Sequence, residues 1–163
     1  MQNFLTNKEI SHEINYIMVK SYTSKKQSEM LIKLGIPIES ADMVYFGIHQ
    51  GMDGKYHLSG TNTEDDVVPI YKNLCIKVFE KTTASDVINQ LPCWSLAALR
   101  ACLPPGISID GILYVFESHN TFDNAWVYEY KFEDISAPLY SKSKNEIDAA
   151  VEMIVQLKEN KMI

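Results

Sequence analysis

Two strand-like segments near the C-terminal end constrain the fold of this chain most strongly. Residues 109–117 and 125–132 are both rich in β-branched and aromatic residues, and a turn-forming stretch joins them. In the second segment alternate residues are aromatic, which places four rings on one face: Trp126, Tyr128, Tyr130 and Phe132. Because an aromatic face of this kind must be buried, the antiparallel pair requires another layer over it.

Helical patterns that begin with capping residues supply this layer. Ser24 and Ser143 each precede a Gln or Glu by three residues, which is the spacing of a capping box, and an apolar stripe follows each. The first stripe predicts a helix over residues 24–34. Ser95 can cap a third helix over residues 94–103. We therefore predict an α+β protein with a mainly antiparallel sheet that two or three helices cover on one face.

The length and the apolar pattern bear on domain organisation and location. The chain has 163 residues, which suits a single domain, and we assign that domain to residues 23–163. Residues 1–22 are interpreted as an N-terminal extension, in which the spacing of Ile10, Ile14 and Ile17 favours a helix and the run from Ile14 to Val19 is the alternative of a short strand. No secretory signal pattern and no apolar run of about 20 residues is visible. We therefore expect a cytoplasmic protein with no membrane partner.

The charge balance argues against nucleic-acid binding. The chain has 21 acidic and 15 basic side chains, a formal charge of −6, and Arg100 is its only arginine. Proteins bind nucleic acids largely by neutralising phosphates with Lys and Arg. We expect no nucleic-acid partner, whereas an acidic surface could complement a basic protein.

Several catalytic and cofactor signatures are absent from the sequence. It contains no P-loop, no Gly-rich dinucleotide fingerprint, no H-E-x-x-H and no G-x-S-x-G. The three cysteines, Cys75, Cys93 and Cys102, have no C-x-x-C spacing, so a disulfide framework and a structural zinc site are both disfavoured. We expect no cofactor.

One local feature could still support nucleophilic catalysis. Cys93 and Ser95 lie at the expected start of a helix, where the helix dipole lowers the pKa of a thiol. A small hydrolase would also need a histidine base, such as His119 or His49, within reach. In the alternative interpretation Ser95 caps the helix, Trp94 packs in the core and Cys93 is a small buried side chain.

Two further sets of residues could bind a ligand or a partner. His49 and His57 flank the hairpin signal at Asp53, and a paired register would bring these potential metal ligands together. The alternative is that these residues are polar because the turn is exposed. Trp94, Tyr128 and Tyr130 could contact a partner, since aromatic residues are enriched at interface hot spots. The alternative is that they belong to the core.

Two longer motifs carry a family resemblance. Gln27–Met43 reads Q-S-x-x-L-x-x-L-G-x-P-x-x-S-A-D-M, and Pro92–Leu99 reads P-C-W-S-L-x-x-L. With the C-terminal amphipathic helix, they resemble small uncharacterised proteins of gut anaerobic bacteria and of their prophages and mobile elements. The resemblance extends from about Tyr22 to Ile163 and implies an accessory protein without an assigned catalytic residue. We therefore expect a non-enzymatic protein that binds another protein or itself, and the alternative is the Cys93 or Ser95 hydrolase.

Overall fold

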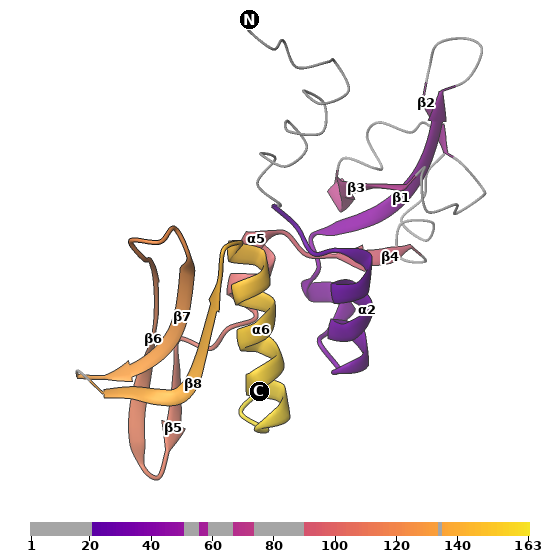
Figure 1. Cartoon of the computed structure of the whole chain (residues 1–163). Coiled ribbons are helices and arrows are strands. Elements are labelled where there is room, and N and C mark those ends of the chain that lie inside the picture. The colour runs from indigo at the N-terminus through magenta and orange to yellow at the C-terminus, as the bar shows by residue number, and fades with distance from the viewer. Residues whose placement is uncertain (1–20, 51–55, 59–66, 74–89, 134) are drawn as a thin grey trace, which may run out of the picture.

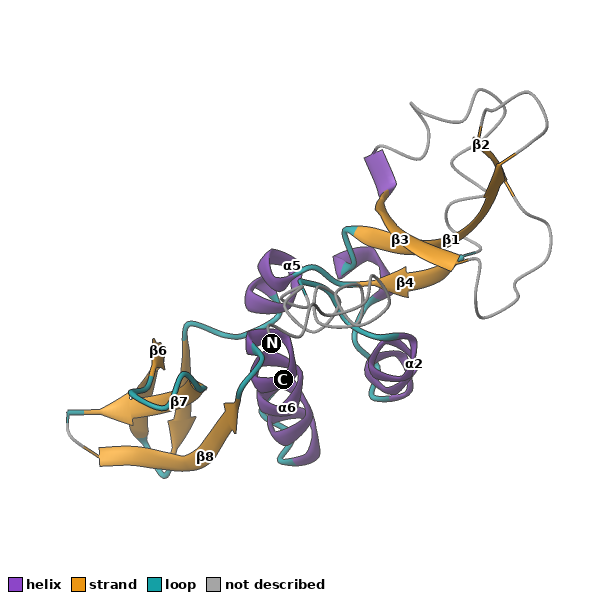
Figure 2. Ribbon diagram, turned by 45° about the horizontal axis from the view of Figure 1, so that its top comes forward, coloured by secondary structure: helices purple, strands orange, loops and turns teal. Residues whose placement is uncertain are grey.

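The computed structural model describes residues 21–50, 56–58, 67–73, 90–133 and 135–163. Within these ranges the chain forms helices and two antiparallel sheets, which confirms the predicted α+β class. The strands are thus divided between two sheets rather than gathered in one. The sheets lie at opposite ends of the described structure, with the helices between them (Figures 1 and 2).

The N-terminal sheet is built around β1. This strand pairs antiparallel with each of the other three strands of the sheet. The register aligns Met43 with Tyr71 and also with Cys93, so the start of β1 is paired on both sides. The strands are β1 (Met43–Gln50), β2 (Tyr56–Leu58), β3 (Val67–Tyr71) and β4 (Leu91–Cys93).

The C-terminal sheet has the strand order β5-β6-β7-β8, and every pair in it is antiparallel. Its strands are β5 (Gly106–Ile109), β6 (Ile112–Asn120), β7 (Trp126–Phe132) and β8 (Ile135–Ser143). The predicted strand over residues 109–117 is wrong at its start. Asp110 and Gly111 have φ angles of 51° and 82°, and they form a two-residue turn between β5 and β6. A hairpin turn with two positive φ angles favours Asp-Gly.

The helices begin at short polar side chains, as the sequence predicts, although one cap is misplaced. Ser24 forms the predicted capping box, and Ser95 accepts a hydrogen bond from the third residue of its helix. The last helix is capped by Asn145 rather than by Ser143, because Ser143 is the final residue of β8. The helices are α2 (Lys25–Lys33), the 3-10 turn η1 (Ile38–Ser40), α5 (Leu96–Ala101) and α6 (Glu146–Glu159). None of the described helices is both long and apolar enough to cross a membrane.

Helix α6 packs against β7 and β8, and the core lies between them (Figure 1). We call this side of the C-terminal sheet the inner face and the opposite side the outer face. Ala149 is fully buried on α6, and its carbonyl accepts a hydrogen bond from Ser141 Oγ of β8 at 2.8 Å. The small side chain lets the helix lie close to the strand. The largest side chains with less than 2% exposure include Trp94, Tyr128, Tyr130, Leu99, Ile147, Met153, Ile154 and Leu157.

The segment before α2 is bonded to elements far along the chain. Thr23 donates its N–H to Trp94 O at 2.9 Å, and Trp94 N donates to Thr23 Oγ1 at 3.0 Å. Gln27 Nε2 of α2 donates to Asp148 Oδ1 of α6 at 2.8 Å. These hydrogen bonds tie Thr23 to the start of α5 and tie α2 to α6.

Candidate protein-binding surface

The two sequence motifs meet at Asp42. Ser95 donates its backbone N–H to Asp42 Oδ1 at 2.9 Å and its hydroxyl to Asp42 Oδ2 at 2.6 Å. Ser95 Oγ also accepts from the amide of Ala98 at 3.3 Å. Trp94 Nε1 donates to Ser40 Oγ at 2.9 Å. These bonds hold the start of α5 against the segment before β1.

The thiol of Cys93 is fully buried in the N-terminal sheet. Its sulfur lies 3.6 Å from Thr23 O and 3.8 Å from Thr23 Oγ1, and the hydroxyl of Tyr45 donates to the same Thr23 carbonyl. Ser95 is also buried, with 5% exposure. A substrate therefore has no direct access to either candidate nucleophile.

The candidate base His119 lies on the outer face of β6, in the other sheet. Its Nδ1 is 3.6 Å from Glu129 Oε1, and Lys131 Nζ lies 2.9 Å from the same oxygen. The described contacts of His119 are thus with its own sheet, whereas Cys93 and Ser95 lie at β4 and the start of α5 (Figure 1). The structure does not bring the three candidate catalytic residues together.

The β1–β2 hairpin contains the predicted metal ligands. Its register makes His49 and His57 direct cross-strand partners. The side chains of both histidines, and the whole of Asp53, lie outside the described part of the chain. Among the residues that are described, no group of three His, Cys, Asp or Glu side chains could hold a metal ion.

The aromatic candidates for partner contact belong to the core. Trp94, Tyr128 and Tyr130 each have 0% exposure. All three side chains therefore lie inside the protein, as the alternative interpretation expects. The two tyrosine hydroxyls have specific partners. Tyr128 accepts from Arg100 Nε and donates to Glu146 Oε1, both at 3.1 Å, and Tyr130 donates to a backbone carbonyl at 2.9 Å. Arg100 and Glu146 also form an ion pair.

These buried phenols predict a loss of stability in alkali. Burial raises the pKa of Tyr45, Tyr128 and Tyr130 above the ordinary value of about 10, and that of Tyr128 to about 12. Since folding favours the neutral phenol, this stabilisation is complete below about pH 10 and is lost as the pH rises toward about 12. Urea unfolding between about pH 8 and pH 12 should show this decline. Ionisation of the three phenols near pH 10 in the folded protein, detected by phenolate absorbance, would contradict the expectation.

The outer face of the C-terminal sheet carries exposed apolar side chains. Leu113, Val115 and Tyr140 are 60%, 52% and 48% exposed. Alternation along β6, and the pairing of Tyr140 with Glu129, place these residues opposite the buried tyrosines. Among the described helices none packs on this face (Figure 1). These three exposed side chains make the outer face a candidate interaction surface.

Charged side chains of both signs lie among these apolar groups. The side chain of Glu129 is only 6% exposed, and Lys131 Nζ lies between it and Glu117 Oε2, at 2.9 Å and 3.6 Å. Its hydrogen bond with Glu129 raises the pKa of Lys131. The outer face therefore combines apolar side chains with a fixed group of ion pairs.

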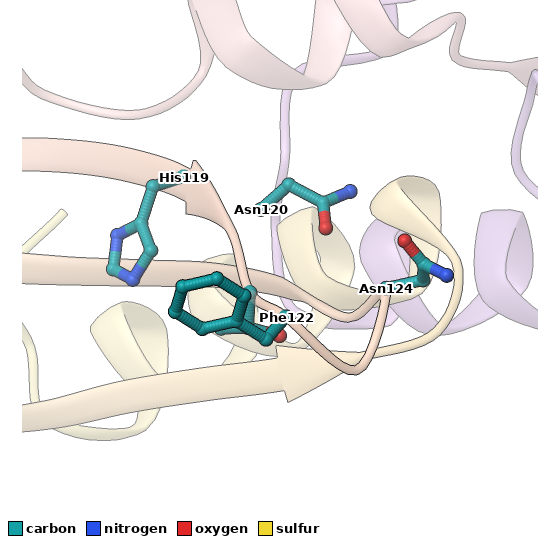
Figure 3. Close-up of a pocket in the computed structure, with 5 residues that line it drawn as sticks. His119, Asn120, Phe122 and Asn124 are labelled. Atoms are coloured by element: carbon teal, nitrogen blue, oxygen red, sulfur yellow. The ribbon is translucent and has the colours of Figure 1, made fainter.

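An open hollow lies at the β6–β7 turn, beside the outer face. Its volume is about 520 Å³, and it is lined by His119, Asn120, Thr121, Phe122 and Asn124. Figure 3 shows the ring of Phe122 on the same side of the turn as the imidazole of His119. Phe122 is completely exposed, which is unusual for a large aromatic side chain. The hollow lies at the end of β6, and Glu117 separates it from Val115 along the outer face.

Comparisons with protein-family models, with curated proteins and with solved structures find no match for this chain. The resemblance carried by the two motifs therefore remains a prediction. The sequence analysis also missed the outer face as a surface. The signal was present in β6, where Leu113 and Val115 alternate with Tyr114 and Phe116, so that both faces of the strand are apolar at its start.

Proposed function

We propose that this chain is a non-enzymatic accessory protein that binds another protein through the outer face of its C-terminal sheet. In keeping with the motif resemblance, we assign it to a bacterial prophage or mobile element and to the cytoplasm. The complex would be centred on Val115 and Phe122. Its partner would present an apolar surface flanked by charges that complement Glu117, Lys131 and Lys142.

The exposed apolar outer face is the observation that carries this proposal. Val115 and Phe122 are 52% and 111% exposed, and their transfer from water to an interface would contribute roughly 25 cal/mol for each Å² of apolar area. The net charge of −6 favours approach of a basic partner. The candidate nucleophiles, in contrast, are buried and bonded within the scaffold.

Substitution of the outer face should weaken binding without unfolding the chain. The full chain, with an N-terminal affinity tag, would be used to isolate a stoichiometric partner from the source cells, and binding would then be measured with both proteins purified. Val115→Glu and Phe122→Ser should each raise the Kd by about thirtyfold, because truncation of an interface hot spot costs about 2 kcal/mol. Both positions are exposed, so thermal stability should change little.

Ile38→Ser is the matched control, since it removes an apolar side chain that is 42% exposed on η1, away from the C-terminal sheet. It should bind like the unmodified chain. Equal affinity of all three variants would exclude the outer face as the binding surface. Failure to isolate any stoichiometric partner would argue against the accessory-protein proposal itself.

A further inference from the structure

The two free edges of the C-terminal sheet differ. On β8, Tyr140 N donates to Gln156 Oε1 at 3.2 Å, and Gln156 Nε2 donates to Tyr140 O at 2.9 Å. The amide of Gln156 thus engages the main-chain groups with which an added strand would pair. Covering an edge in this way is a common protection against unwanted strand pairing. Helix α6 therefore closes the β8 edge at Tyr140.

The β5 edge has no such cover in the described part of the chain. Pro105 O accepts from Phe116 N at 3.1 Å, which identifies these residues as a hydrogen-bonded pair at the start of the hairpin. Bonded and non-bonded pairs alternate in an antiparallel ladder, so the main-chain groups of Gly106 and Ser108 point away from β6. Among the described residues these groups have no hydrogen-bond partner.

The side chains beside this edge favour pairing of β5 with β5 of a second copy of the chain. On the outer face β5 carries only Gly106 and Ser108, and Leu113 Cδ1 lies 3.1 Å from the place that a Cβ at Gly106 would occupy. Leu113 thus leans toward the edge, and it is 60% exposed. Strands β5 of two copies would not repel each other, because Gly106–Ile109 has no charged residue. Each Leu113 would then cover the small side chains at the seam.

We propose that two copies of the chain pair antiparallel through β5 and join their four-stranded sheets into one continuous sheet. With the two-fold axis at Ile107, Gly106 of one copy faces Ser108 of the second copy. On the other side of the axis, Ser108 of the first copy faces Gly106 of the second. Each facing pair exchanges two main-chain hydrogen bonds. The dimer goes beyond the proposed partner binding, since it leaves Val115 and Phe122 open and doubles the surface that they form.

Sedimentation of the full chain tests this dimer. At about 100 μM the unmodified chain should sediment with twice the chain mass of 18.6 kDa. Ser108→Pro removes the outward N–H without touching a β5–β6 bond, so it should give a folded monomer. Ser108→Lys, which adds a charge to the edge, should do the same. Ala97→Lys, at an exposed position of α5, is the matched control and should stay dimeric.

Amide hydrogen exchange locates the seam independently. The amides of Gly106 and Ser108 should exchange at least tenfold more slowly at dimer-forming concentrations than after dilution. The dimer is refuted if the unmodified chain sediments as a single copy, if both Ser108 variants stay dimeric, or if these two amides exchange fast in a dimer. Partner binding is judged separately, because Val115→Glu should weaken partner binding yet remain dimeric.

Discussion

Replacement of Trp94 by alanine is expected to lower the free energy of unfolding by about 3–5 kcal/mol. The indole is fully buried in the main core, where alanine would leave a cavity. The substitution also removes the hydrogen bond from Trp94 Nε1 to Ser40 Oγ. Because domains of this size are stable by only about 5–15 kcal/mol, the variant should unfold at a much lower urea concentration, as followed by circular dichroism.

Trp126, the other tryptophan, provides the control for this experiment. It is half-buried on the same sheet as the aromatic core, and Trp126→Phe should cost less than about 1.5 kcal/mol. Trp94→Phe keeps most of the packing and loses the bond to Ser40, so its effect should lie between those of the other two variants. A Trp94→Ala protein with unchanged stability would show that the contact between the two motifs at Trp94 and Ser40 is not part of the core.

Replacement of Asp42 by alanine is expected to cost about 2–3 kcal/mol, since hydrogen bonds to a charged group contribute about 1.5–3 kcal/mol. Both carboxylate oxygens accept from Ser95, which also caps α5. Asp42→Asn should cost less, because its remaining oxygen still accepts from the Ser95 amide. Urea unfolding would measure each variant, and Glu152→Ala, at an exposed carboxylate of α6, should change stability by less than about 0.5 kcal/mol.

A double-mutant cycle makes the Asp42 prediction specific. Ser95→Ala alone should cost about 1–2 kcal/mol through loss of the cap and of the bond to Asp42. The double variant should cost at least about 0.5 kcal/mol less than the sum of the single variants, because both changes remove the same interaction. Strict additivity would mean that the carboxylate and the hydroxyl act independently.

The parts of the fold that the sequence predicts well are those set by neighbouring residues. Alternation of aromatic residues predicts the buried face of β7, and Tyr128 and Tyr130 are fully buried there, whereas Phe132 at the end of the strand is 41% exposed. The caps at Ser24 and Ser95 form because the side chain bonds the first turn of its own helix. The turn at Asp110–Gly111 is likewise determined by neighbouring residues. The Asp-Gly hairpin rule that predicts a turn at Asp53 also predicts this one.

Other features depend on contacts that no local pattern contains. Strand β8 includes Pro138 and several serines, a composition that fits a strand only at the edge of a sheet. The bond between Asp42 and Ser95 joins residues 53 positions apart. The exposure of Leu113 and Val115 depends on which face of the sheet α6 covers. A candidate surface of this kind becomes visible only after the layers are assembled.

The hydrogen bonds that join Thr23 to Trp94 and Gln27 to Asp148 also bear on how the chain folds. They connect residues 71 and 121 positions apart, so α2 gains its contact with α6 long after its contact with β4 can form. Contacts of long sequence separation slow folding, because the intervening loop must close before the contact forms. The packing of α2 is therefore completed only when α6 is present.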